Sequence, residues 1–136
     1  MEAWMTNFEK VGEFRKKLKL PMSDVPTFLS PEETSYFARF ILEELSEYMR
    51  ACEEQDLTSA ADGLADLMYV TLGCAHAMGL PFDEIFDVVH KCNMQKVPAS
   101  DEWRSLRGKQ YDVVKPPGFT GPEWEISILI KASQGI

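Results

Sequence analysis

Apolar residues recur at helical spacing in four stretches of this 136-residue chain, and this periodicity constrains the fold more than any other feature. The first stretch predicts a helix over residues 6–18, which a proline ends. The second begins at a strong helix-start signal, in which Ser30 caps, Pro31 takes the first helical position and Glu33 completes a capping box. This second helix is expected to continue to about Glu54. The chain is therefore predicted to be all-α.

Two further helices are expected after short breaks in the apolar pattern. Thr58 is expected to cap a helix over residues 59–78, which is the most apolar of the four and should be central. Gly79 suits the left-handed position that follows a helix C-terminus. Pro81 opens a fourth helix that ends near Lys96. Four helices joined by short connections predict an antiparallel four-helix bundle.

The chain changes character after Pro98. Residues 99–122 contain three glycines and three prolines, which predicts a long irregular segment of the kind that is often functional. Residues 123–133 are compatible with a short last helix, but isoleucines at alternate positions also allow a strand over residues 125–130. The length of the chain predicts a single domain over residues 1–136.

Charge and composition exclude several classes of function. The chain has 14 basic and 22 acidic residues and a formal net charge of −8, which argues against binding to duplex nucleic acid or to an anionic membrane. A nucleotide is not excluded, because bound divalent cations can reverse the local field. The three cysteines have no CxxC spacing and predict neither a disulfide framework nor a zinc site. Residues 1–4 lack the basic start of a signal peptide, and no apolar run has the length of a membrane span, so we expect a cytoplasmic protein.

Acidic residues gather on the second and third predicted helices. Glu43, Glu44 and Glu47 are three or four residues apart, so they share one broad helix edge. Asp62 and Asp66 are four apart on the third helix. Because a short break joins these two helices, we expect them to be antiparallel neighbours whose acidic edges can meet.

Two readings of these acidic edges stay open from the residues alone. Mg²⁺ prefers oxygen ligands in octahedral geometry and retains several waters, so carboxylates and substrate phosphates suit it, and it would relieve the repulsion among crowded like charges. The three glutamates are equally compatible with a solvated helix face. Asp62 and Asp66 are harder to explain in that way, because they interrupt the most apolar helix, where an unpaired carboxylate is costly.

Four segments, in this order along the chain, resemble the MazG-like all-α nucleoside triphosphate pyrophosphohydrolases, a superfamily that includes MazG, dimeric dUTPases and phosphoribosyl-ATP pyrophosphohydrolase. Residues 43–47 resemble its EExxE motif, and residues 62–73 resemble the second acidic helix of the MazG-like branch. Residues 90–96 resemble its Asn-x-x-Lys segment. Residues 115–119 resemble a Lys-Pro-x-Gly-aromatic motif of dUTP-hydrolysing relatives. The resemblance extends over about residues 8–122.

The resemblance implies a metal site that holds Mg²⁺ or Mn²⁺. By position, Glu44, Glu47 and Asp66 correspond to metal ligands, and Glu43 to a ligand or to the group that positions the attacking water. The second family motif is usually ExxD, and Gly63 stands here at its Glu position, with Asp62 one residue earlier. One residue is about 100° on a helix, so Asp62 would ligate from a different angle or through water.

The resemblance also implies an activity and an assembly. The reaction releases pyrophosphate from a nucleoside triphosphate, with Asn93, Lys96 and Lys115 as substrate contacts and the lysines stabilising charge on the leaving pyrophosphate. Its purpose would be removal of unwanted nucleotides, with dUTP or a non-standard nucleotide as candidates, and the protein would be a homodimer or a dimer of dimers. The alternative is a non-catalytic helical protein that binds a nucleotide or a partner through a degenerate metal site, which Gly63 favours.

Overall fold

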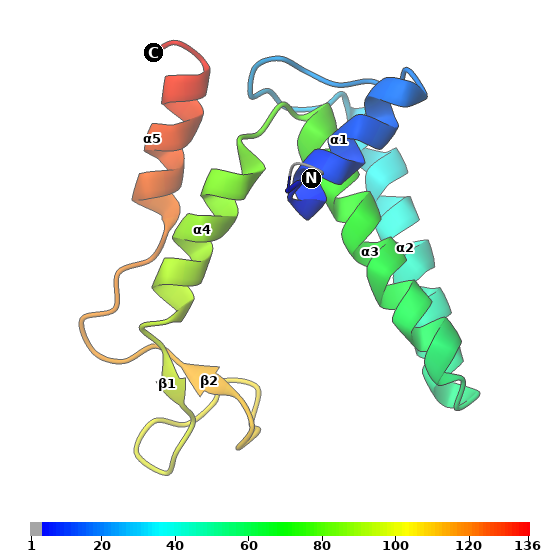
Figure 1. Ribbon diagram of the computed structural model, residues 1–136. Helices are drawn as coiled ribbons and strands as arrows, with labels where there is room; N and C mark the ends of the chain where they lie inside the picture. Colours follow the sequence, from blue (N-terminus) through cyan, green and yellow to red (C-terminus); the bar gives the residue numbers. More distant parts are fainter. Residues whose placement is uncertain (1–3) are drawn as a thin grey trace. The chain divides into compact units, whose positions relative to one another are not determined.

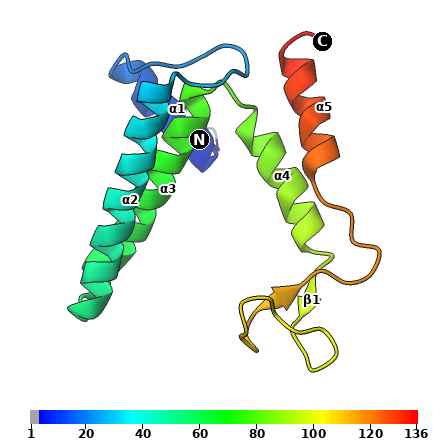
Figure 2. The same ribbon diagram turned by 180° about the vertical axis from the view of Figure 1, so that it is seen from behind.

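The computed structural model describes residues 4–136 (Figures 1 and 2), and the start of the N-terminal sequence that argued against a signal peptide, residues 1–3, lies outside them. Within the described residues the chain forms five helices and one small two-stranded sheet, so the predicted all-α class is confirmed. None of these helices is long and apolar enough to cross a membrane. The chain divides into two compact units, one ending at Phe82 and one beginning at Asp83.

The first helix, α1 (Asn7–Lys17), packs against α3 through its buried face. A capping box between Thr6 and Glu9 starts α1. The imidazole of His76 on α3 stacks on the ring of Phe8 at 3.7 Å between centroids, and its Nε2 lies 2.6 Å from the carbonyl oxygen of Phe8. A Cβ on Gly12 would lie 2.7 Å from the His76 ring, so this contact requires glycine in α1.

Helices α2 (Pro31–Glu53) and α3 (Leu57–Ala77) form a hairpin and lie side by side in both views (Figures 1 and 2). The capping box of Ser30 and Glu33 is present as predicted. The predicted cap of α3 at Thr58 is wrong: Asp56 is the cap, and its carboxylate accepts the backbone N–H of Ser59 at 3.0 Å. A carboxylate one residue before the helix reaches this N–H, whereas Thr58 already lies inside the first turn.

Contacts along the hairpin establish that α2 and α3 run antiparallel. Phe37, early in α2, packs with Val70, late in α3. Tyr48, late in α2, lies against Gly63, early in α3. A Cβ on Gly63 would be 3.1 Å from the Cα of Tyr48, so the close approach of the two backbones depends on the missing side chain.

The core of the first unit lies between the first half of α2 and the second half of α3. Phe37, Val70 and Ala77 are buried together, and partly buried residues pack around them: Leu29, Phe40, Ile41 and Cys74. Gly79 ends this unit's helical hairpin with a φ of 66°, in the left-handed conformation that the sequence predicted.

The second unit contains most of α4 (Phe82–Asn93), then β1 (Val97–Pro98), β2 (Val113–Val114) and α5 (Glu123–Ser133). The fourth helix ends at Asn93, three residues before the predicted end. The last segment is a helix with the predicted bounds, so the strand alternative for it is wrong.

Residues 99–122 are largely irregular, as predicted, except that β2 pairs antiparallel with β1. An ion pair of 2.8 Å between Lys91 and Glu125 connects α4 with α5. Asp112 accepts hydrogen bonds from Ser105 and Arg107, and these contacts hold the loop between the strands.

Candidate active site

The α2–α3 hairpin carries all five carboxylates that the sequence selected. Glu43, Glu44 and Glu47 lie on α2, and Asp62 and Asp66 lie on α3. Glu44 and Asp66 are half-buried, whereas the other three are exposed. The three glutamates share one edge of α2 because they are three or four residues apart, while apolar residues of the same helix face the core.

Electrostatics distinguish Glu44 from the other four carboxylates. Burial raises the pKa of the Glu44 carboxyl, and the negative charges of Glu47, Asp66, Glu43 and Asp62 raise it further, in that order. Residues of both helices therefore act on Glu44, so the structure brings the two acidic edges within electrostatic reach of one another.

Within residues 4–136, the five carboxylates make no side-chain hydrogen bond with the protein. The Oε2 atom of Glu44 is buried and has no hydrogen-bond partner. None of the four carboxylates that act on it makes a side-chain hydrogen bond or an ion pair with another described residue. An orphaned, half-buried carboxylate among others of like charge is costly unless a cation neutralises it.

These residues fit a hard divalent cation by their chemistry. Mg²⁺ takes oxygen ligands, keeps several waters and is usually bound by one or two carboxylates together with substrate phosphates. Across residues 4–136, however, no three acidic, histidine or cysteine side chains converge into a ready-made metal cage. Waters and phosphate oxygens would complete the coordination.

A cavity of about 280 Å³ opens beside Glu44 and Asp66. Its other walls are mostly apolar and aromatic, with Phe14 of α1 and Tyr69 of α3 in edge-to-face contact at 5.3 Å between centroids. Tyr69 lies one turn from Asp66 on α3 and lines the cavity beside it.

Sequence reasoning missed Arg15, which also lines this cavity. Its side chain is buried, with only 8% of its surface exposed. Burial lowers the pKa of its guanidinium, while Tyr36 and Cys74 raise it. The signal was present in the sequence, because Arg15 follows the buried Val11 by four residues and so lies on the apolar face of α1.

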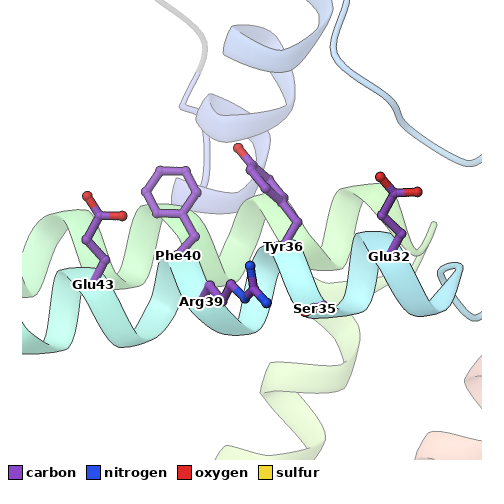
Figure 3. Close-up of a pocket in the computed structure, with 6 residues that line it drawn as sticks. All are labelled: Glu32, Ser35, Tyr36, Arg39, Phe40 and Glu43. Carbon is purple, nitrogen blue, oxygen red and sulfur yellow. The ribbon is translucent and has the colours of Figure 1, made fainter.

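A wider hollow lies along the neighbouring surface of α2. Figure 3 shows the side chains of Glu32, Tyr36, Phe40 and Glu43 projecting from the same side of this helix. The hollow has a volume of about 570 Å³. Tyr36 and Phe40 line both the hollow and the cavity, whereas Glu43 lines the hollow alone.

The predicted substrate contacts belong to the second unit. Asn93 is the last residue of α4, and its carbonyl oxygen accepts the backbone N–H of Lys96 at 3.0 Å. Lys115 directly follows β2, is exposed, and holds its Nζ 5.5 Å from the ring centroid of Phe119. The turn that brings Phe119 under Lys115 contains Gly118 with a φ of 80°. A cationic side chain is thus held over an aromatic ring of its own loop.

The family model of phosphoribosyl-ATP pyrophosphohydrolase matches residues 11–93. The match includes α2 and α3 with their five carboxylates and extends to Asn93, whereas Lys96 and Lys115 lie beyond it. No curated protein matches the chain significantly. The match covers more than half of the chain, together with the helical hairpin and its acidic edges. The chain therefore belongs to the phosphoribosyl-ATP pyrophosphohydrolase family, within the MazG-like all-α nucleoside triphosphate pyrophosphohydrolase superfamily.

Proposed function

We propose that this protein hydrolyses a nucleoside triphosphate to the monophosphate and pyrophosphate, with Mg²⁺ or Mn²⁺ as its cofactor. Family membership supports a pyrophosphohydrolase acting on a nucleotide-like substrate. The metal-dependent hydrolysis of a triphosphate is supported by the Oε2 atom of Glu44, which has no hydrogen-bond partner. The Glu44 side chain is half-buried among four other carboxylates at the edge of a cavity. A substrate with about four negative charges would be repelled by such a site without a cation.

The acidic residues take distinct roles in this proposal. Glu44, Glu47 and Asp66 would hold the cation, with Asp62 as a further ligand from a different angle or through water. When bound, the cation supplies positive charge that stabilises the phosphates and polarises the attacking water. Glu43 orients this water as a hydrogen-bond acceptor, since it is exposed on α2 one residue from Glu44.

The basic residues act on the phosphates. Lys96 and Lys115 stabilise the charge that develops on the leaving pyrophosphate, and Asn93 contacts the substrate. The contact between Lys115 and Phe119 supports this role, because a lysine held by its own loop loses less entropy on binding a phosphate. The biological purpose would be removal of unwanted nucleotides, with dUTP or a non-standard nucleotide as candidate substrates.

A homodimer or dimer of dimers belongs to the same proposal. The α2–α3 hairpin exposes large apolar side chains at helical spacing, which are Leu42, Leu45 and Met49 on α2, and Leu64 and Met68 on α3. An exposed apolar face of this kind supports burial against a second copy of the chain. A monomer at micromolar concentration in analytical ultracentrifugation would contradict the proposed assembly.

A non-catalytic nucleotide-binding protein is the second candidate. It is favoured by the absence of a ready-made three-ligand cage among the described residues. It is favoured also by Gly63, because a glutamate there would meet the backbone of Tyr48. In this case the five carboxylates would bind a cation and a nucleotide without turnover.

Substitution of single ligands separates the two candidates. Pyrophosphate release is measured with Mg²⁺ across a panel of ribo- and deoxynucleoside triphosphates, for the wild type and for Glu47→Gln and Asp66→Asn. We expect each variant to abolish turnover and the control Glu53→Gln, an exposed glutamate at the end of α2, to leave it unchanged. Nucleotide binding without pyrophosphate release by the wild type would favour the second candidate.

A further inference from the structure

Arg15 presents a cation that the proposed chemistry does not use. Its Nη2 donates a hydrogen bond to the carbonyl oxygen of Pro21 at 2.7 Å. Its Nε is buried without a partner, and its Nη1 makes no hydrogen bond with another described residue. Arg15 also forms no ion pair with any described carboxylate. Apart from Nη2, the guanidinium N–H groups of Arg15, a residue with 8% of its surface exposed, have no hydrogen-bond partner among the described residues.

A buried cation with unused donors needs a compensating interaction. A buried charge without a partner is strongly destabilising, because the protein interior does not replace the hydration that the charge loses. The centroid of the Phe37 ring lies 5.8 Å from the guanidinium carbon and supplies a cation–π contact. This contact does not provide a hydrogen-bond acceptor in the plane of the guanidinium. The protein thus keeps a positively charged donor ready at the cavity wall.

The cavity joins this donor to the metal-binding carboxylates. Glu44 and Asp66 line the same cavity as Arg15, and aromatic side chains line it as well. A volume of about 280 Å³ lies just below the usual range for ligand pockets, which is roughly 300–1,000 Å³. One molecule with phosphates at the carboxylates and a flat ring between the aromatic side chains would reach both ends.

Phosphate is the wrong partner for the Arg15 end of the cavity. A phosphate group would lose its hydration among Val11, Phe37 and Val70, which is far costlier than burying a neutral heterocycle there. Aromatic side chains such as Phe14 and Tyr36 favour flat rings by stacking or edge contact. The phosphates belong instead at the carboxylates, where a divalent cation can neutralise them.

We propose that Arg15 determines base specificity by donating a hydrogen bond from its unpaired guanidinium N–H groups to a keto oxygen of the substrate's nucleobase. This inference rests on the proposed function in that it takes the ligand to be a nucleotide. A guanidinium donates and never accepts, so it favours a keto oxygen over an exocyclic amino group at the same place on the ring. Hypoxanthine should bind better than adenine, and uracil better than cytosine.

Calorimetric binding of nucleoside monophosphates in the presence of Mg²⁺ tests this selection without requiring turnover. The wild type should bind inosine monophosphate about tenfold more tightly than adenosine monophosphate, and uridine monophosphate about tenfold more tightly than cytidine monophosphate, as one charge-assisted hydrogen bond implies. Arg15→Lys keeps the charge, but all its N–H donors are on one nitrogen, so it cannot donate to Pro21 and to the base at once and should bring both ratios close to one. Arg15→Met, which removes all donors, should do the same.

A matched control and a phosphate probe separate selection from a structural role. Arg39→Lys, at an exposed arginine of the α2 hollow, should leave both ratios unchanged. Pyrophosphate with Mg²⁺ should bind wild type and Arg15→Lys equally. If Arg15→Lys keeps its wild-type melting temperature and both keto-to-amino ratios, or loses pyrophosphate affinity as much as nucleotide affinity, the inference is overturned.

The outcomes also distinguish this inference from the proposed hydrolysis. Release of pyrophosphate by a wild type whose ratios do not depend on Arg15 would overturn base selection alone. If both keto-to-amino ratios fall close to one in Arg15→Lys while the wild type releases no pyrophosphate, base selection is supported and hydrolysis is overturned. A wild type that binds none of the four monophosphates would overturn base selection.

Discussion

Replacement of Glu44 by glutamine should stabilise the metal-free protein and remove its response to Mg²⁺. The Oε2 atom of Glu44 is buried without a partner, and burial first and then four neighbouring carboxylates raise the pKa of the Glu44 carboxyl. Its repulsion with Glu47, three residues along the same helix, costs about 0.2–0.5 kcal/mol. Desolvation of an unpaired polar atom costs about 1–3 kcal/mol, of which a neutral amide recovers a part. The free energy of unfolding should therefore rise by about 1 kcal/mol.

Thermal unfolding followed by circular dichroism provides the assay. At neutral pH with EDTA, Glu44→Gln should melt roughly 4 °C above the wild type, the usual shift for about 1 kcal/mol in a domain of this size. Saturating Mg²⁺ should raise the melting temperature of the wild type but not of the variant. The control Glu53→Gln should follow the wild type in both buffers.

The pH dependence of this effect has a definite sign. Because the folded-state pKa of Glu44 is raised above its ordinary value of 4.5, the folded protein binds the proton more tightly than the unfolded chain. Protonation therefore stabilises the metal-free wild type as pH falls through the raised pKa. The advantage of Glu44→Gln should vanish below about pH 4. A variant that melts below the wild type in EDTA, or that responds equally to Mg²⁺, would refute this account of the acidic edges.

Three further predictions concern other parts of the molecule. Lys96→Ala and Lys115→Ala should each weaken nucleotide binding or turnover by roughly 1–3 kcal/mol with unchanged melting temperature; wild-type kinetics for Lys115→Ala alone would restrict the site to the helices. Gly63→Ala should lower the melting temperature, since an overpacking cost of about 1–3 kcal/mol exceeds the roughly 1 kcal/mol that alanine gains in a helix; an unchanged or higher value would contradict the close backbone approach. The hydrogen bond from Arg107 lowers the pKa of Asp112 to about 2, so Asp112 contributes stability above about pH 4 that is lost as pH falls towards 2. In carboxyl NMR titrations Arg107→Ala should raise this pKa, and an unshifted titration would count against the pairing.

Local signals in the sequence predicted most of the secondary structure. The capping box at Ser30 and the left-handed glycine at Gly79 act within a few residues, so they could be recognised without the fold. The cap of α3 could not be predicted in this way, because Asp56 and Thr58 are both good caps by residue type and only the path of the chain selects Asp56. The alternating isoleucines of residues 123–133 are compatible with both a helix and a strand, so the local pattern alone could not predict the helix that forms.

The candidate site was predicted in its composition but not in its tertiary detail. Helical spacing predicted that the three glutamates of α2 share an edge, and the hairpin brings them within electrostatic reach of Asp62 and Asp66. That Glu44 alone has a buried, orphaned oxygen depends on the depth at which it packs, which spacing does not encode. Arg15 went unrecognised because α1 buries it against residues distant in the sequence.

We propose that this protein breaks the bond between the α- and β-phosphates of a nucleoside triphosphate by means of a divalent cation. Phosphorus NMR of a reaction with Mg²⁺ identifies that bond directly, because its cleavage yields a monophosphate and pyrophosphate, whereas cleavage at the terminal phosphate yields a diphosphate and orthophosphate. We predict monophosphate and pyrophosphate in equal amounts from at least one nucleotide of the panel, with no product in EDTA or from Asp66→Asn. Diphosphate and orthophosphate as the products, or the same pyrophosphate release from Asp66→Asn as from the wild type, would contradict the account.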